Sequence, residues 1–536
     1  MRMKFLAAAA LAVAALSPAA SLAQPAEPTV ELRVRSVNDI LDKVEYVAGL
    51  AGQEEGVKQF RELVKQLSAD GKGIEGIDPK RPFGAYAAMT DDVVSSPVVV
   101  MVPIADKERF LTMLKDRAGL TPEQVAGGTV KLMVPLVNEI HLGFANDYLY
   151  VTPRAADLDP KKLVPPKTFF AADDGAAASL LVRVDRIPAE VRKVFLGQFE
   201  MKIAEERKNK KDGESVAEFK LKNMMLDAAV AGAKGLFDDC KELAVRLVID
   251  AKTDELAAEV SVTPKPGTTA AKNFASLGAK TSLPAGIVGA KNAVARAGGK
   301  IELTPDLKTQ LKAVVDAMVE EGLKTAGDRA SAEKAFDAIT PTLKSGELDY
   351  AVAMTGPDAK GKHSVMFALG AKDAKEIEKL LKEFAPFIPE DAAKVTFDAE
   401  KIGAFTLHKI EAKQLDDNVE KLFGTKTIWL AISDTCVAVG IEESGDAIKA
   451  ALKAKPAATA AQGVEVSVAK LIPLTENKLK PDELKALMKD AFGDGPPAGK
   501  DTLAFSVEGG DKLSVKFKVK GKAFRLLATL EQFKVK

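Results

Sequence analysis

Hydrophobic and polar residues alternate with a period of two along many short stretches of this chain, and each stretch predicts a β-strand with one buried face. Four of these strands run into a segment with helical periodicity. They are Glu31 to Arg35 before Val37 to Leu50, Leu180 to Val184 before Pro188 to Leu196, Val288 to Ala295 before Pro305 to Leu323, and Val464 to Val468 before Pro481 to Phe492. Further alternating strands follow each pair. The pattern predicts an α+β fold of mostly antiparallel sheet, with the helices packed on one face.

The same pattern occurs twice. Tyr86-Ala87-Ala88-Met89-Thr90 returns about 265 residues later as Tyr350-Ala351-Val352-Ala353-Met354-Thr355. Later segments repeat in the same order, with Val98 to Val102 matching Val365 to Leu369, Ile140 to Val151 matching Ile428 to Val439, Val182 to Pro188 matching Val466 to Pro473, and the strand pair Leu243 to Ile249 and Leu256 to Val262 matching Leu503 to Val507 and Leu513 to Val519. Asp106 and Asp373 are expected to cap the helix that follows the second segment. The repeat predicts a tandem duplication.

Clusters of Pro, Ala and Lys near Lys167, Ser282 and Pro456 suggest boundaries within this duplication. The predicted division is a signal peptide (1–23), module 1A (24–167), module 1B (168–282), module 2A (283–456) and module 2B (457–536). The offset between the copies falls to about 257 at the last strand pair, so residues 200–234 are extra in the first half. Their charged run from Glu205 to Asp212 predicts a solvated helix or hairpin, with a partner-binding arm as the alternative.

The N-terminus predicts export. Arg2 and Lys4 precede an apolar stretch from Phe5 to Leu16, and Ser21-Leu22-Ala23 fits a signal-peptidase site. Twelve apolar residues cannot span a bilayer, and no later segment reaches 18, so a periplasmic or extracellular protein that does not span the membrane is expected. Cleavage would reduce the basic residues from 76 to 74 against 76 acidic ones. That balance gives no field for binding nucleic acid.

The composition is that of an ordinary globular protein. The chain of 536 residues is 47% hydrophobic and 28% charged, and this length requires more than one core. Aromatic residues are few, with one Trp (Trp429) and five Tyr, so Ala and Val must fill much of the interior. The two cysteines, Cys240 and Cys436, do not occupy equivalent places in the repeat. They could form a disulfide or remain two buried thiols. Neither has a second Cys or a His at the spacing of a zinc site.

Three motifs look catalytic or cofactor-binding and fail on their context. Gly71 to Gly76 spells a dinucleotide fingerprint, but a helix precedes it instead of a strand, so a connector is expected. Gly493 to Asp501 carries Asp501 where a phosphate loop needs a hydroxyl. Ser467 and Lys470 have the Ser-x-x-Lys spacing, but the alternation of Val464, Val466 and Val468 predicts a strand that sends the two side chains to opposite faces.

Histidine is scarce, and His141, His363 and His408 each lie in or beside a predicted strand without a partner at motif spacing. No catalytic, cofactor-binding or metal residue is therefore assigned. The acidic pairs Asp173-Asp174 and Asp238-Asp239 lack the alternating ligands of a calcium loop and are expected at turns and caps.

The export signal, the repeated strand–helix–meander units and the segment Gly76 to Gly84 resemble a group of exported proteins of planctomycete-type bacteria. The resemblance implies a compartment and a fold, and no active residues.

Three functions follow as expectations. The first is a non-catalytic binding or scaffold protein of the bacterial cell envelope, whose partner is an unknown protein or envelope component. The second is a carrier of an apolar, lipid-like ligand between sheet and helices. The third is a hydrolase whose residues converge from distant positions, with His141 or His408 as the base.

Overall fold

A computed structural model describes residues 27–66, 74–135, 138–171, 175–211, 213–289, 293–474, 480–493 and 499–534. The predicted signal peptide, residues 1–23, lies outside these residues, and export stays a prediction. None of the helices in the described ranges is long and apolar enough to cross a membrane.

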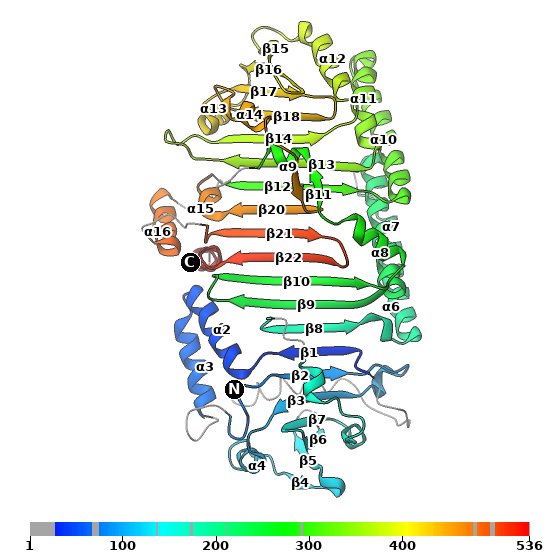
Figure 1. Ribbon diagram of the computed structural model, residues 1–536, viewed down its shortest axis with the longest axis vertical. Coiled ribbons are helices and arrows are strands. Elements are labelled where there is room, and N and C mark those ends of the chain that lie inside the picture. The colour runs from blue at the N-terminus through cyan, green and yellow to red at the C-terminus, as the bar shows by residue number, and fades with distance from the viewer. Residues whose placement is uncertain are drawn as a thin grey trace.

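Twenty strands form one antiparallel sheet that runs the length of the molecule (Figure 1). Its centre is the pair β10 (Glu255–Pro264) and β22 (Leu513–Lys520). Outward from β10 follow β9 (Cys240–Asp250), β8 (Ala178–Arg183), β1 (Val30–Val34), β2 (Phe83–Ala87), β3 (Val98–Pro103), β7 (Tyr148–Thr152), β6 (Asn138–Ala145), β5 (Val130–Val134) and β4 (Glu123–Gln124). Outward from β22 follow β21 (Thr502–Glu508), β20 (Gln462–Ser467), β12 (Ala295–Glu302), β13 (Glu347–Thr355), β14 (Ser364–Gly370), β18 (Cys436–Ile441), β17 (Thr427–Ile432), β16 (Phe405–Ala412) and β15 (Ala393–Ile402). The α+β class is confirmed.

The central pair has a symmetric register. Leu256 faces Val519 and Val262 faces Leu513, so Glu259 faces Lys516 in the middle. Counted outward from this point, the strands of the two halves follow the chain in the same order. The four predicted modules are part of this one sheet, and their boundaries stay a prediction.

The match of Tyr86 with Tyr350 is wrong in its register. Both residues lie on the second strand of their half, but Tyr86 faces Glu31 whereas Tyr350 faces Gly299. The ladders place Phe83, not Tyr86, at the position of Tyr350. A shift of three residues sends a side chain to the opposite face, because the side-chain period of a strand is two. The segments beginning at Val98, Ile140 and Val182 do occupy the same positions in their ladders as Val365, Ile428 and Val466.

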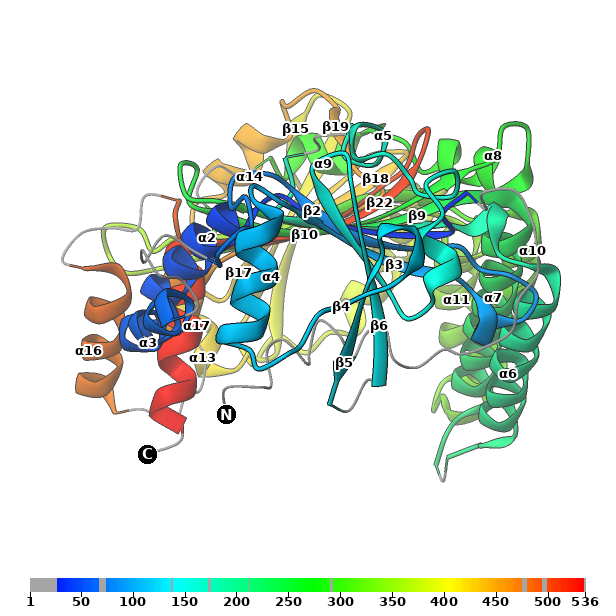
Figure 2. The ribbon, with the colours of Figure 1, turned by 90° about the horizontal axis from the view of Figure 1, so that it is seen from below.

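Helices lie on both faces of the sheet, so the expectation of a single helical face is wrong. On one face, Figure 2 shows two groups of helices along the two sides of the sheet. One group is α2 (Val37–Leu50), α3 (Glu54–Gln66), α16 (Pro481–Phe492) and α17 (Gly521–Lys534); the other is α6 (Ala189–Lys208), α7 (Val216–Asp239), α10 (Pro305–Thr325) and α11 (Arg329–Lys344). We call these groups the two helical walls.

Shorter helices cover the rest. On the same face as the walls, α4 (Lys107–Asp116) and α12 (Ala374–Phe384) pack over the outer strands at the two ends of the sheet. On the other face lie α5 (Pro166–Phe169), α9 (Leu283–Ile287) and α14 (Asp446–Ala451). Helices α8 (Thr269–Ser276), α13 (Asp417–Phe423) and α15 (Val468–Leu471), and the two-stranded ladder of β11 (Lys280–Ser282) and β19 (Ala457–Thr459), complete the regular elements.

Several local predictions need correction. Val288 caps the end of α9 and the predicted strand begins only at Ala295, because Leu283-Pro284 and the Ser282 cap favour a helical turn here. Asp106 caps α4 by accepting the N–H of Arg109 at 3.0 Å, whereas the side chain of Asp373 makes no cap bond and its φ is 54°. Strand β20 ends at Ser467, so Lys470 lies on a helix.

Within the segment 200–234, residues 200–208 end α6 and residues 216–234 form most of α7. The helical part of the prediction agrees with these elements, but α7 does not stand alone in solvent. It packs against α10 of the other half, and the N–H of Val216 donates to Glu321 Oε1 at 2.6 Å. The segment therefore extends one helical wall across the centre of the sheet.

Candidate functional site: an open apolar sheet face

The most unusual surface of this protein is the face of the central strands that lies between the helical walls. In the eight central strands, β1, β8, β9, β10, β22, β21, β20 and β12, the register places alternate side chains on this face. The members that we call the open apolar face are Leu32, Leu180, Val245, Leu247, Ala258, Val260, Val515, Phe517, Phe505, Val507, Val464 and Ala297.

The alternation that predicts the strands also makes this face apolar. Leu32, Leu180, Val245 and Val260 form one continuous cross-strand row. Leu247, Ala258, Phe517 and Phe505 form the next. Gln462 is the only polar side chain that the ladders of these eight strands place on this face, and it exchanges hydrogen bonds with the hydroxyl of Tyr350 at 2.7 and 2.9 Å.

These apolar side chains are not covered. Phe517 is 48% exposed, Leu247 is 44% and Leu32 is 42%, and the rest of the set is half-buried or exposed. An antiparallel sheet normally packs its apolar face against a second layer. A large, continuous exposed apolar surface is typical of a site that binds a ligand, a membrane or another protein.

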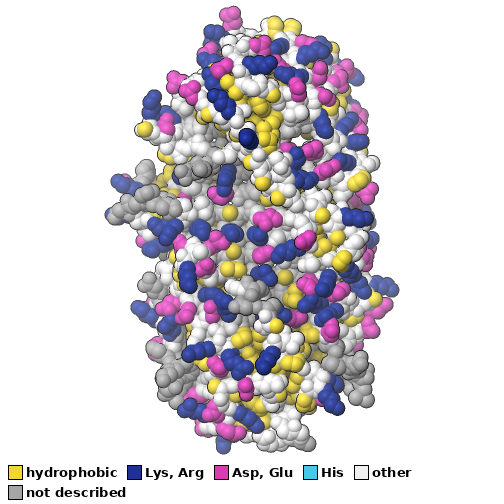
Figure 3. Space-filling model, in the orientation of Figure 1, with side chains coloured by type: hydrophobic (Ala, Val, Ile, Leu, Met, Phe, Trp, Pro, Cys, Tyr) yellow, Lys and Arg dark blue, Asp and Glu magenta, His cyan; other side chains and the backbone are white. Residues whose placement is uncertain are grey.

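The opposite face of the same strands is polar and ion-paired. Glu31 bonds Arg33 and lies 3.7 Å from Arg183, and Lys516 pairs with Glu508 at 2.7 Å. Lys518 pairs with Glu255 at 3.1 Å. Figure 3, which looks onto this face, shows acidic and basic side chains intermixed across its middle. The polar face is the ordinary solvent side of the sheet, which makes the exposure of the apolar side the exception.

The walls and the end helices frame the open apolar face. The walls project beyond the sheet along both of its sides (Figure 2). At the two ends of the sheet, Phe110, Met113 and Leu114 of α4 and Leu381 of α12 pack onto the same face. The exposed apolar side chains lie on the central strands and continue onto β13 and β14, where Leu348 is 46% and Phe367 is 36% exposed.

The cover at one end contains a buried polar cluster. Glu378 of α12 lies between Lys375 (2.6 Å) and Lys382 (2.9 Å), and Lys382 also binds Asp398 of β15 at 2.9 Å. His408 of β16 is fully buried beside them, with Nε2 3.6 Å from Glu378 Oε1. Burial alone would raise the pKa of Glu378, but its bonds to Lys375 and Lys382 outweigh burial and lower it. Burial lowers the pKa of His408, against the attraction of the two carboxylates.

Glu378, Asp398 and His408 are close enough to share a metal ion. Their hydrogen bonds argue for a different role. His408 Nδ1 accepts the N–H of Asp398 at 3.1 Å, so the neutral ring carries its proton on Nε2, the nitrogen that faces Glu378. A metal-binding histidine needs the reverse tautomer, with the second nitrogen donating. The ammonium group of Lys382 already lies between both carboxylates, so the cluster is a neutralised charge network that ties α12 to β15 and β16.

The other histidines have separate surroundings. His141 Nε2 lies 2.9 Å from Glu139, which also binds Lys131. His363 is buried beside the turn at Gly356, and its ring nitrogens have no hydrogen-bond partner among the described residues. The interactions of the described residues give neither His141 nor His408 a Ser, Thr or Cys partner. The convergent hydrolase gains no support from this arrangement.

Cys240 and Cys436 are two buried free thiols. Seven strands separate β9 from β18, so at about 4.8 Å per strand the two sulfurs are far too distant to bond. Burial raises the pKa of the Cys436 thiol to about 12 and also raises that of Cys240. Neither is a reactive thiolate.

The three sequence motifs that resemble catalytic or cofactor-binding sites have structural roles, as far as the structure describes their residues. Gly76 has a φ of +79°, and a β-carbon there would lie 2.4 Å from the carbonyl oxygen of Asp106, so this glycine closes the turn against α4. Residues 71–73 and 494–498 lie outside the described ranges. Asp501 is buried, where it accepts bonds from the Ser467 hydroxyl and the N–H of Ala469.

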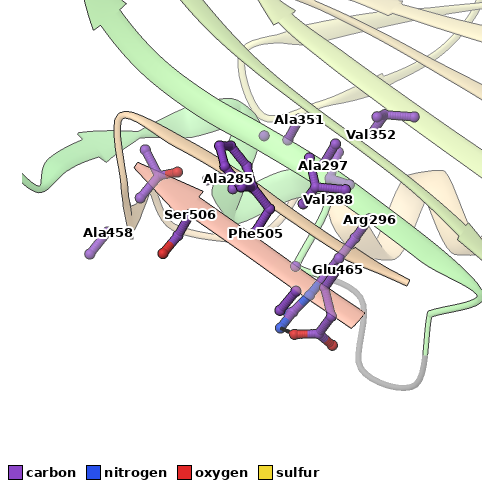
Figure 4. Close-up of a pocket in the computed structure, with 16 residues that line it drawn as sticks. Ala285, Val288, Arg296, Ala297, Ala351, Val352, Ala458, Glu465, Phe505 and Ser506 are labelled. Carbon is purple, nitrogen blue, oxygen red and sulfur yellow. Dashed lines mark hydrogen bonds and ion pairs between the residues drawn. The ribbon is translucent and has the colours of Figure 1, made fainter. Parts of the chain in front are cut away.

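A smaller depression lies on the polar face, under α9. Its volume is about 320 Å3, and its floor is formed where Gly298 faces Gly463. Arg296 and Glu465 form an ion pair of 2.7 Å at its rim, joined by a dashed line in Figure 4. In the first half, Arg33 and Ser179 occupy the ladder positions of Gly298 and Gly463, counted from the centre. The rim charges already neutralise one another, so the depression offers no free charge to a ligand.

Comparison of the chain with protein-family models, with curated proteins and with solved structures found no match. The candidate site therefore rests on the geometry alone. Sequence reasoning noted the abundance of small aliphatic residues but did not identify the open apolar face. The alternation showed which side chains share a face, whereas only the placement of the helices shows that the face is uncovered.

Proposed function

We propose that this protein is a non-catalytic binding protein that carries apolar chains, such as the acyl chains of a lipid, on its open apolar face. The observation that supports it is the exposure of Leu32, Leu247 and Phe517 on a surface with a single, already bonded polar side chain. Burial of apolar area is worth about 25 cal/mol per Å2, so an apolar ligand that covers these side chains gains most of its affinity from them.

An extended, flexible ligand fits this surface better than a second copy of the chain does. The walls project past the sheet on both sides (Figure 2). A second copy with the same walls would meet the first wall to wall, which keeps the two sheets apart. A hydrocarbon chain can lie between the walls and follow the cross-strand rows, and it has no hydrogen-bonding groups that the apolar side chains would leave unsatisfied.

Two adjacent residues on opposite faces provide a matched test. Phe517 is 48% exposed on the apolar face, and the side chain of Lys518 is 46% exposed on the polar face. We expect Phe517→Gln to weaken palmitate binding at least tenfold, because a buried phenyl contact is worth about 1.5–3 kcal/mol and 1.4 kcal/mol is tenfold. Lys518→Gln should leave the affinity unchanged. Native mass spectrometry of each protein with increasing palmitate measures both.

Failure of the wild-type protein to bind palmitate, and the absence of any copurified lipid after isolation from its own envelope, would refute the carrier. An equal loss in both variants would place the ligand elsewhere. A concentration-dependent dimer that Phe517→Gln dissolves would make the open apolar face a subunit interface instead.

We also propose that the protein acts in the cell envelope, as the pattern from Arg2 to Ala23 and the resemblance to exported planctomycete-type proteins suggest. The test is the mass of the N-terminal peptide from the native host. A mature chain that begins at Gln24 would support export, whereas an intact Met1 would contradict it.

The order of the strands supports a further proposal, that the chain is a tandem duplication. The ladders align Val98 with Val365 and Val182 with Val466, the same matches that the sequence repeat predicts. The halves meet at β10 and β22, which are themselves the matched last strands. An experimental structure in which the halves do not superpose over these ladders would overturn it.

A further inference from the structure

We infer that the ligand of the open apolar face is an uncharged ester lipid, whose carbonyl group lies at Gln462 and Tyr350 with an apolar chain on either side of it. The inference rests on the proposed function. The first observation is the polarity of this side of the sheet. The ladders of the eight central strands and of β13 and β14 place only these two polar side chains on it, and neither is charged. An ionised headgroup would lose water here without gaining a counter-charge from these strands, so the surface favours an uncharged ligand.

Gln462 and Tyr350 meet across a strand that has no side chain between them. Tyr350 of β13 faces Gly299 of β12, and this glycine lies beside Gln462 of β20. A β-carbon at Gly299 would lie 2.1 Å from the carbonyl oxygen of Ala461, which restricts the position to glycine. The Tyr350 hydroxyl therefore reaches across β12 and donates to Gln462 Oε1 at 2.9 Å, while Gln462 Nε2 donates to the hydroxyl at 2.7 Å.

The pair keeps one hydrogen-bond donor for a ligand. A glutamine amide has two N–H groups and a tyrosine has one O–H. One N–H and the O–H are used between the two side chains, and the interactions of the described residues leave the second N–H of Gln462 free. Both side chains are half-buried, so this donor lies at the surface of the sheet. A carbonyl oxygen matches it, because a single donor satisfies a carbonyl group and it brings no hydrogen of its own.

The polar pair lies inside the apolar surface and not at its end. Towards the centre of the sheet, Phe505 and Phe517 are 37% and 48% exposed. On the other side, Leu348 of β13 and Phe367 of β14 are 46% and 36% exposed. A lipid with a terminal polar group at the pair would cover one of these sides and leave the other exposed. An ester has carbon chains on both sides of its carbonyl group, so it covers both.

The first half has the apolar surface without the polar pair. Counted along the ladders from the centre, Ala178 of β8 takes the place of Gln462, and Phe83 of β2 takes the place of Tyr350. Apolar residues therefore fill these positions in one half, which shows that the sheet does not need a polar pair there. The second half is consequently the half that orients the ligand.

The test is a competition between decyl decanoate and heneicosane, an alkane of the same chain length without the ester group. Native mass spectrometry of the protein with equal amounts of both probes separates the two complexes by mass and gives the ratio of the two affinities. Gln462→Leu should shift this ratio towards the alkane by about tenfold, because the carbonyl group then lies on an apolar surface without a donor. Lys518→Gln, on the polar face, should leave the ratio unchanged.

The outcomes separate this inference from the carrier. If both probes bind and Gln462→Leu has the same ratio as the wild-type protein, the inference is wrong and the carrier stands. Equal shifts in Gln462→Leu and Lys518→Gln would place the ester away from Gln462 and overturn the inference. If neither probe binds and palmitate does not bind either, the carrier is refuted together with the inference.

A measurement on the wild-type protein covers the case in which Gln462→Leu fails to fold. A hydrogen bond lowers the carbonyl stretching frequency of an ester, and water, which donates more than one bond, lowers it further. Infrared spectra of decyl decanoate labelled with carbon-13 at its carbonyl group should therefore give a frequency in the complex between those in hexane and in water. A frequency equal to either of these two would contradict a carbonyl group held by one donor.

Discussion

Across the central strands, one face of the sheet carries paired charges and the other carries uncovered Leu, Val and Phe side chains. Towards the ends of the sheet, the same apolar face is packed under α4 and α12. The comparison between the covered ends and the open centre shows that the sequence pattern is the same in both places. What differs is the position of the helices, which close over the outer strands but stand beside the central ones. The apolar side chains of the open centre therefore have no second layer over them, and under the proposed function an apolar ligand would supply that layer.

The largest expected effect is the loss of stability when a charge is placed on the covered part of the apolar face instead of the open part. Leu430 of β17 is 9% exposed under α12, whereas Phe517 is 48% exposed in the centre. We expect Leu430→Asp to lower the free energy of unfolding by about 3–5 kcal/mol, because it creates a cavity and buries a charge. Phe517→Asp should change it by less than about 1 kcal/mol.

Urea unfolding of the two variants beside the wild-type protein checks this difference. A similar loss in both would mean that the centre is covered in solution as well, by a dimer or by a rearranged wall.

A pH-dependent effect of intermediate size distinguishes the covered end from the centre. Burial holds the pKa of His408 below its usual value of about 6.5. Below pH 6.5 the unfolded chain therefore binds a proton that the folded chain does not, and stability falls as the pH decreases towards the folded pKa. The slope contributed by this one group is at most about 1.4 kcal/mol per pH unit.

Urea midpoints between pH 5 and 8 measure this effect. His408→Gln removes the titrating group, so the variant should lose this part of the pH dependence. If the variant and the wild-type protein have parallel pH profiles, His408 is not the buried neutral ring described above.

The smallest expected effect is on the polar face. Lys518 and Lys520 both pair with Glu255, at 3.1 and 3.0 Å, and all three side chains are partly solvated. Exposed pairs contribute about 0.2–1 kcal/mol, so Lys518→Gln should lower the unfolding free energy by less than about 1 kcal/mol, and by less still at 1 M salt. A loss above 2 kcal/mol would mean that this face is buried against something in solution.

The sequence alone predicted a large part of this fold. The alternation located β9, β10, β21 and β22, and the matched segments occupy corresponding ladders. The match of the two tyrosines failed because two short segments of Tyr, Ala and Met can be aligned on their tyrosines, whereas the ladders shift the match by three residues. The cluster at His408 could not be predicted, because Glu378, Asp398 and His408 are spread over 30 residues and meet only when α12 folds onto the sheet. The open apolar face could not be predicted for the same reason, because the exposure of its side chains depends on where the helices pack on the sheet.

The register at the centre has a consequence for assembly. Glu259 of β10 faces Lys516 of β22. If two copies of the first half paired through their β10 edges in this register, two glutamates would face one another, and two copies of the second half would bring two lysines together. Like charges directly opposite each other destabilise a strand pair. The β10 edge therefore disfavours pairing with another β10, and the β22 edge disfavours pairing with another β22. If the two halves were expressed as separate polypeptides, they would form the β10–β22 heterodimer in preference to either homodimer.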